Sequence, residues 1–123
     1  MQYILLIYGD ESEGGTTSPE EMAKSMQEWG DYTQYLKDKG YHLAGDALHP
    51  THDATTVRVR EGKTITTDGP FAETKEQLGG YYVVDCPSLD EAIDSSARMP
   101  IGMHGTVEIR PIMVFDEEGR PSM

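Results

Sequence analysis

The sequence has 123 residues, which is enough for one hydrophobic core and too few for two. Its 22 acidic and 10 basic side chains give a formal net charge of -12, which disfavours direct binding to nucleic acid or to an anionic membrane surface. A hydrophobic content of 37% is ordinary for a globular protein and argues against wholesale disorder.

The chain begins with an apolar run at residues 3–8, YILLIY. Because every position is apolar, we predict a strand that is buried on both faces. The run is too short for a signal sequence, and no other stretch reaches transmembrane length. Cys86 is the only cysteine, so an intrachain disulfide is excluded and a reducing compartment fits best. We therefore expect a cytoplasmic protein without membrane contact.

Residues 19–39 have the pattern of an amphipathic helix. Ser18 can cap its start, Pro19 suits the first helical position, and Glu21 can complete a capping box. Gly40 can adopt the left-handed conformation that ends a helix. One face is predicted to be buried because its residues recur at three- and four-residue spacing. These residues are Met22, Met26, Trp29, Thr33 and Leu36.

Three further strand segments follow. Residues 41–48 predict a strand that is interrupted at Gly45. Residues 55–60 and 63–67 alternate on either side of Glu61-Gly62, which predicts a β-hairpin with a two-residue turn.

The second half of the chain repeats the strand–helix–strand order. A turn at residues 68–71, Asp-Gly-Pro-Phe, and a charged segment lead into a predicted strand over residues 80–85. Ser88 begins a second capping box, and the helix ends before Pro100. Its predicted buried face consists of Leu89, Ala92, Ile93, Ser96 and Ala97. Residues 106–115 predict a last strand interrupted by Pro111, and residues 116–123 form a polar tail.

This order, β-α-β, hairpin, β-α-β, predicts an α+β fold of the ferredoxin-like sandwich type with an antiparallel sheet. We assign residues 1–115 to a single domain. Two helices can cover only one face of a four-stranded sheet, yet two strands look apolar on both faces. A second copy of the same sheet is the economical cover, so we predict a homodimer.

Three segments together resemble the DGPF subgroup of the YCII-related proteins: YILLIYGDE, TTVRVREGKTITTDGPFAETKEQLGGYYVVD and VEIRPI. The similarity extends over nearly the whole chain. It implies a dimeric α/β barrel of ferredoxin-like subunits, in agreement with the argument from the sheet faces.

The resemblance also implies two classes of function. Some YCII-related proteins are suspected enzymes with a His-Asp pair in a cleft, whereas DGPF proteins are often encoded beside extracytoplasmic-function sigma factors. In one branch the histidine of the pair lies on the first helix, but residues 19–39 here contain none. Any dyad must therefore use a different histidine. The expected function is binding or acid-base conversion of a small molecule in an intersubunit cleft; the alternative is a non-catalytic accessory protein that contacts a sigma factor or another regulator.

Asp68, Glu73 and His49 are the candidate catalytic residues. Asp68 is either a general base or the residue whose carboxylate fixes the turn. Glu73 either approaches Asp68, which would raise the pKa of one carboxyl group, or lies on a solvated loop. His49 follows the second strand and is either a surface histidine or the partner of Asp68.

Five residues are candidate ligand contacts. Arg58 and Lys75 could hold an anionic group of a ligand, although both also suit a solvated surface. Phe71 belongs to the Asp-Gly-Pro-Phe turn, Tyr82 faces either the core or the cleft, and His104 precedes the last strand. The histidines have no spacing typical of a metal site, and no phosphate-binding glycine motif is found, so we predict neither a metal nor a cofactor.

Overall fold

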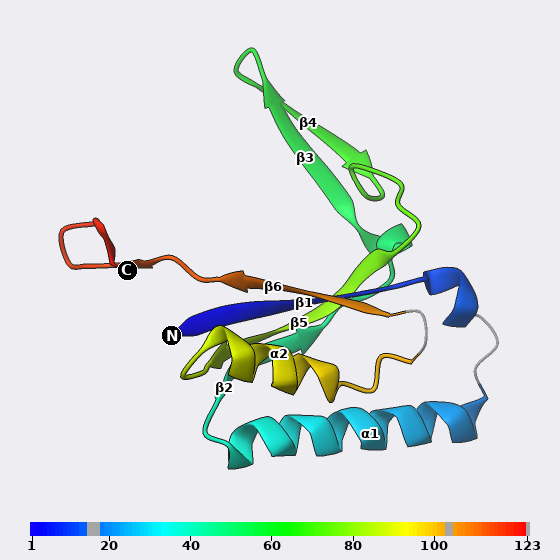
Figure 1. The fold of residues 1–123 in the computed structure, drawn as a ribbon. Helices are drawn as coiled ribbons and strands as arrows, with labels where there is room; N and C mark the ends of the chain where they lie inside the picture. Colours follow the sequence, from blue (N-terminus) through cyan, green and yellow to red (C-terminus); the bar gives the residue numbers. More distant parts are fainter. Residues whose placement is uncertain (15–17, 103–104, 123) are drawn as a thin grey trace.

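The computed structural model describes residues 1–14, 18–102 and 105–122. Four antiparallel strands form the main sheet in the order β2-β5-β1-β6. Their bounds are β1 (Gln2–Gly9), β2 (His42–Ala47), β5 (Gln77–Asp85) and β6 (Thr106–Pro111). Two helices, α1 (Pro19–Asp38) and α2 (Leu89–Ala97), lie on the same face of this sheet (Figure 1). The predicted α+β, ferredoxin-like architecture is therefore confirmed.

Local sequence signals place the helix ends correctly. Ser18 Oγ accepts a hydrogen bond from the Glu21 amide at 3.1 Å, and Ser88 Oγ accepts one from the Glu91 amide at 3.3 Å. Gly40 follows α1 with φ of 77°, the left-handed conformation expected of it.

The helices cover one face of the sheet and not the other. Tyr3 and Leu5 of β1 and Tyr82 and Val84 of β5 are buried under the helices, where they form the core with Leu36 of α1. The alternate side chains point to the face opposite the helices, and those in the middle of β1 and β5 are half-buried. This second face, the open face, carries Ile4, Leu6, Tyr81, Val83, Glu108 and Arg110. It is the mostly apolar second face that the sequence predicts.

The buried face predicted for α1 is wrong in its first half. Met22 and Met26 are 55% and 69% exposed, and every residue from 20 to 28 is exposed. The helix packs on the sheet only from Trp29 onward, with Tyr32 and Leu36 buried. A periodic pattern gives the apolar stripe of a helix, but the length of that stripe which meets the sheet depends on the tertiary arrangement.

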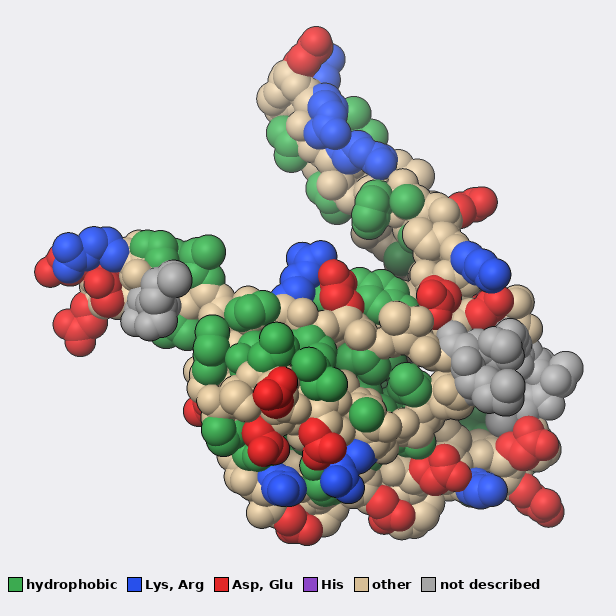
Figure 2. All heavy atoms as spheres, viewed as in Figure 1, with side chains coloured by type: hydrophobic (Ala, Val, Ile, Leu, Met, Phe, Trp, Pro, Cys, Tyr) green, Lys and Arg blue, Asp and Glu red, His purple; other side chains and the backbone are tan. Residues whose placement is uncertain are grey.

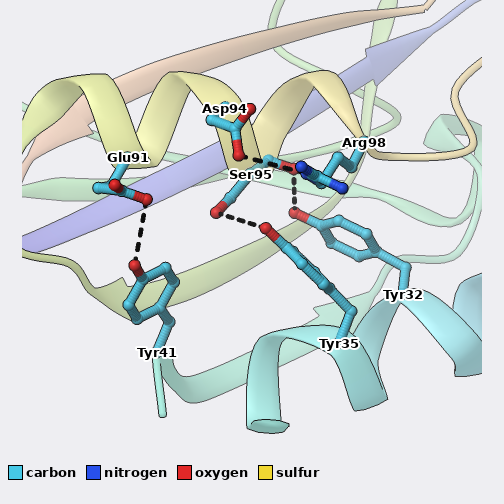
Figure 3. Close-up of polar contacts among 7 residues, drawn as sticks. All are labelled: Tyr32, Tyr35, Tyr41, Glu91, Asp94, Ser95 and Arg98. Atoms are coloured by element: carbon cyan, nitrogen blue, oxygen red, sulfur yellow. Dashed lines mark hydrogen bonds and ion pairs between the residues drawn. The ribbon is translucent and has the colours of Figure 1, made fainter. Parts of the chain in front are cut away.

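The predicted face of α2 is also wrong in part. Leu89 and Ile93 are about half exposed, whereas Ala92, Ser95 and Ser96 are buried. The helix thus packs through small side chains, and hydrogen bonds connect it to α1 (Figure 3). Tyr32 Oη donates to the Ser95 carbonyl oxygen at 2.8 Å. Burial is the main cause that raises the pKa of Tyr32 above its ordinary value.

The predicted hairpin is confirmed as β3 (Thr55–Arg60) and β4 (Lys63–Asp68). Its turn residues Glu61 and Gly62 have φ of 53° and 77°, as a type I′ turn requires. The hairpin, which we call the arm, projects from the body on the side opposite the helices (Figure 1).

The remaining elements are short. They are η1 (Glu11–Gly14), η2 (Thr51–Asp53), β7 (Val114–Phe115) and β8 (Pro121–Ser122). The last two pair with each other, so the segment predicted as a polar tail contains one strand of a small hairpin. Two predicted strand details differ as well: β5 begins at Gln77, and the irregularity of β2 lies between His42 and Ala44 instead of at Gly45.

Candidate functional site

A cavity of about 580 Å³ lies between α1, the sheet and the segment that follows α2. Trp29 and Thr33 of α1 line one wall, and Pro100, Ile101 and Gly105 line another. Ile7 of β1 contributes to its lining from the sheet. The volume is in the range of cavities that hold small organic ligands in proteins.

The cavity is hollow because the sheet has almost no side chains there. Gly45, Ala47 and Gly80 are neighbours across the β2–β5 pair and all line the cavity. A Cβ atom on Gly45 would lie 2.6 Å from Cδ1 of Tyr82, and one on Gly80 would lie 3.0 Å from the Asp46 carbonyl oxygen. Both glycines therefore allow a close approach that a larger residue would disturb.

Aromatic rings form much of the remaining wall. The rings of Trp29 and Tyr82 are nearly parallel, with an interplanar angle of 20° and centroids 6.4 Å apart. His42 meets Tyr82 edge-on, with ring centroids 6.0 Å apart. A planar or apolar ligand would find favourable surface on these rings.

The direction of the hydrogen bonds at this wall can be assigned. Thr33 Oγ1 donates its single proton to the Trp29 carbonyl oxygen at 2.9 Å. The contact of 2.7 Å between Thr33 Oγ1 and Tyr82 Oη must then have Tyr82 as its donor. Tyr82 Oη thus has no proton to offer to a ligand, but it can still accept one hydrogen bond.

Asp10 and Asp46 are among the lining residues, but Asp46 is paired with Tyr81 across β2 and β5, so its carboxylate lies on the open face and not in the cavity. Asp46 Oδ2 accepts a hydrogen bond from Tyr81 Oη at 2.6 Å, and this bond raises the pKa of Tyr81. Asp10 Oδ1 accepts hydrogen bonds from the amide and hydroxyl groups of Ser12 at 2.9 and 2.6 Å. No lysine or arginine occurs among the described residues that line the cavity.

The candidate catalytic residues from the sequence lie elsewhere. Asp68 ends β4 at the base of the arm, where its backbone pairs with Thr55. The turn after it is held by the Gly69 amide, which donates to the Ala54 carbonyl oxygen at 2.7 Å. Asp68 and Glu73 are exposed, and neither carboxylate has a partner among the described residues.

His49 has a partner other than Asp68. Its side chain is 89% exposed, and its Nδ1 atom lies 3.3 Å from Asp53 Oδ2. His52 contacts the same carboxylate at 3.4 Å. Within the described ranges, no group of three or more His, Cys, Asp or Glu side chains is arranged to hold a metal ion.

Of the five candidate ligand contacts, Tyr82 lines the cavity and is 9% exposed. Arg58 lies on the arm and Lys75 on the loop before β5, both exposed and outside the lining, and Phe71 is 78% exposed. His104 lies outside the described residues.

Sequence reasoning missed Thr33, Asp46 and Gly45 as residues of a cavity. The helical spacing places Thr33 only on the buried face of the first helix, and Gly45 predicts only a strand irregularity. The available signal was the concentration of glycine and alanine in two strands, residues 44–47 and 79–80. Their adjacency across the sheet could not be read from the chain.

Comparison with known proteins adds two findings. A family model described as the YCII-related domain matches residues 1–116. An uncharacterised protein of Rhizobium meliloti (strain 1021) is 39% identical over 124 residues, an alignment that covers 99% of this chain and the whole of that protein. Among the described residues, neither helix combines the length and the apolar character of a membrane span.

Proposed function

The chain belongs to the YCII-related family, and on that premise we propose that it binds a small organic molecule in the cavity between α1 and the sheet, as a homodimer. The observation that carries the proposal is the cavity itself. Its floor is open because of Gly45 and Gly80, and Trp29 and Tyr82 contribute aromatic rings to its lining. This combination of an apolar hollow with a few polar groups is typical of ligand sites.

The open face supports the homodimer. Ile4, Leu6 and Val83 form its apolar part, and Glu108 and Arg110 at its margin are paired at 3.2 Å. Both helices cover the other face, so a second sheet of the same kind would bury these side chains. A symmetric pairing brings the same apolar surface from both subunits together.

The arm supports the same assembly. A two-stranded hairpin is only marginally stable in water by itself, and Val57 and Val59 are exposed on one of its faces. The arm has three basic and two acidic side chains, while the rest of the chain is strongly acidic (Figure 2). It rises on the side of the sheet where the second copy would sit, so the body of that copy offers charge of the opposite sign.

Acid-base conversion of the bound molecule is the more specific form of the proposal. A base must reach the ligand, and Asp46, whose carboxylate accepts the Tyr81 hydroxyl group on the open face, could act only on a ligand that reaches that face. Asp68 and Glu73 could act only on a ligand bound at the base of the arm. Asp46→Asn and Asp68→Asn variants separate these two arrangements, because turnover should depend on only one of them.

The second candidate function is that of an accessory protein that contacts a sigma factor or another regulator. The exposed Phe71 and the apolar side chains of the arm favour it. If a variant of the arm leaves the dimer intact, the arm is free for such a partner.

Amide NMR mapping of a fragment library tests the proposed function. Fragments that bind should shift the amide signals of Trp29, Thr33, Gly80 and Tyr82 together. Shifts confined to Asp68, Glu73 and their neighbours would move the site to the base of the arm. If no fragment shifts the signals of the cavity, the proposed function is wrong.

A further inference from the structure

We propose that the arm of each subunit binds the C-terminal hairpin, residues 113–122, of a second copy of the chain. The C-terminal hairpin contains the paired strands β7 and β8 and extends beyond the end of the sheet (Figure 1). This contact deepens the proposed function and rests on its homodimer, since it joins two subunits.

The arm and the C-terminal hairpin leave the sheet at opposite ends. The arm is connected to the end of β2 at Ala47 and to the beginning of β5 at Gln77, which pairs with Gly9 at the end of β1. The C-terminal hairpin follows β6, whose last residue, Pro111, pairs with Tyr3 near the start of β1. The 8 residues of β1 separate these two ends by roughly 25 Å. The two elements of one chain therefore lie apart (Figure 1).

A two-fold axis that lies across the strands would bring the two elements together between subunits. Such an axis places the two open faces against each other with their strands running in opposite directions. The Gly9 end of β1 in one subunit then lies over the Gln2 end of β1 in the other. Because the arm rises on the side of the open face, it meets the C-terminal hairpin of the second copy. An axis along the strands would instead bring the two arms together.

The charges of the two elements favour the first arrangement. Residues 57–67 of the arm contain three basic side chains and one acidic side chain, a net charge of +2. Residues 113–122 contain three acidic side chains and one basic side chain, a net charge of -2. Two arms would therefore repel each other, whereas an arm and a C-terminal hairpin attract.

Several of these charged groups have no partner within the subunit. Among the described residues, the side chains of Arg58, Lys63 and Glu117 form no ion pair and no hydrogen bond. The basic residue of the C-terminal hairpin, Arg120, is already paired with Asp116 at 3.3 Å. The cations of the arm and the carboxylate of Glu117 are thus available for a contact between subunits.

Both elements also expose apolar side chains. Val57 and Val59 of the arm and Met113 and Phe115 of the C-terminal hairpin are each more than half exposed. Figure 2 shows apolar side chains beside charged ones on both elements. A two-stranded hairpin is marginally stable by itself, so each element gains stability when the other covers its apolar side chains.

Cross-linking of introduced cysteines tests this contact. Cys86, the only native cysteine, is buried and should not react. Val59→Cys and Ile65→Cys, on opposite faces of the arm, are each combined with Phe115→Cys, and the three single variants are the controls. After treatment with a short bismaleimide, we expect at least one double variant to yield tenfold or more covalent dimer than any single variant.

Light scattering on the native chain distinguishes a failure of this contact from a failure of the proposed function. A monomeric native chain would contradict the homodimer and the contact together. If the native chain is dimeric and neither double variant cross-links, the contact is wrong and the homodimer stands. Equally strong cross-linking of a single arm variant would place arm against arm, which also overturns the contact.

The dissociation constant of the dimer provides a second measurement. Phe115→Ser should raise it at least tenfold, because it removes an apolar side chain from the contact. Met22→Ser makes a similar change at an exposed residue of α1 and should leave the constant unchanged. Lys63→Glu should weaken the dimer, and its combination with Glu117→Lys should recover part of the loss. A native dissociation constant for Phe115→Ser would contradict the contact.

Discussion

Tyr82 Oη lies 2.7 Å from Thr33 Oγ1, and this hydrogen bond joins the middle of the sheet to α1 at the wall of the cavity. It holds the Tyr82 ring beside Trp29 and fixes which atoms of the wall can accept a proton. The bond therefore contributes both to the packing of α1 and to the chemistry of the proposed site.

Removal of this hydroxyl group should separate the two contributions. Tyr82→Phe keeps the ring, so we expect a folded protein whose free energy of unfolding is lower by about 1 kcal/mol. Thermal and urea unfolding measure this loss. Tyr35→Phe is the control outside the cavity, because the Tyr35 hydroxyl makes only a long contact of 3.5 Å with Ser95. If both substitutions lower the free energy of unfolding equally, the Tyr82–Thr33 hydrogen bond does not contribute more to stability than the long Tyr35–Ser95 contact.

Two glycines of the same strand pair should differ sharply. Gly45→Ala places a Cβ atom 2.6 Å from the Tyr82 ring, so we expect a loss of about 1–3 kcal/mol in the free energy of unfolding and a displaced ring. Gly79→Ala is the matched control, since its Cβ atom would meet only the Ile7 carbonyl oxygen at 4.0 Å. Urea unfolding measures the loss of stability, and the fluorescence of Trp29 reports whether the neighbouring Tyr82 ring is displaced. If Gly45→Ala is as stable as Gly79→Ala, the close packing described for Tyr82 is incorrect.

The homodimer should depend on the open face. Leu6→Asp introduces a charge among apolar side chains at the proposed interface, so we expect monomers at micromolar concentration. Leu89→Asp makes the same change at an exposed leucine on α2 and should leave the dimer intact. Light scattering with size-exclusion chromatography measures both masses. A dimeric Leu6→Asp variant with a native circular dichroism spectrum would exclude this face as the interface.

Stability should fall in alkaline solution. Burial raises the pKa of the Cys86 thiol and of Tyr32 in the folded protein above their ordinary values of 9.0 and 10.0. These two groups keep protons in the folded state that the unfolded state releases, so their contribution to the free energy of unfolding is fully present below about pH 9 and declines above it.

Tyr32→Phe tests the tyrosine part of this decline. The variant should lose about 1 kcal/mol at pH 7, because the hydrogen bond to the Ser95 carbonyl oxygen is gone. It should also lose less stability than the native chain between pH 9 and pH 11. Urea unfolding at several pH values gives both quantities, and parallel alkaline declines would show that Tyr32 does not contribute.

The parts of the fold that the sequence predicts correctly are set by neighbours along the chain. The caps at Ser18 and Ser88 involve residues three positions apart, and the turn at Glu61 and Gly62 needs only the backbone freedom of two residues. The α+β, ferredoxin-like class followed from the order of elements along the chain and from the resemblance, because few topologies connect β-α-β units in this order.

The sequence does not predict the features that depend on contacts between residues far apart in the chain. Met22 and Met26 match the periodic stripe of α1, but both are exposed because the helix packs on the sheet only from Trp29 onward. Gly45 and Gly80 create a cavity only because β2 pairs with β5, and Thr33 is 49 residues away from Tyr82. The sequence therefore drew attention to Asp68 and its turn, whose charge and turn residues are conspicuous in the chain, while the cavity consists largely of inconspicuous small residues.

The most direct test is a crystal structure of the protein soaked with the fragment that shifts the amide signals of the cavity residues most strongly in the NMR mapping. We expect density for the fragment in the cavity, beside Trp29, Tyr82 and Gly80, in a dimer whose subunits pack through their open faces. Density beside Asp68 and Glu73 with an unoccupied cavity would contradict the proposed site. It would return the site to Asp68 and Glu73, two of the residues that the sequence alone indicates as catalytic.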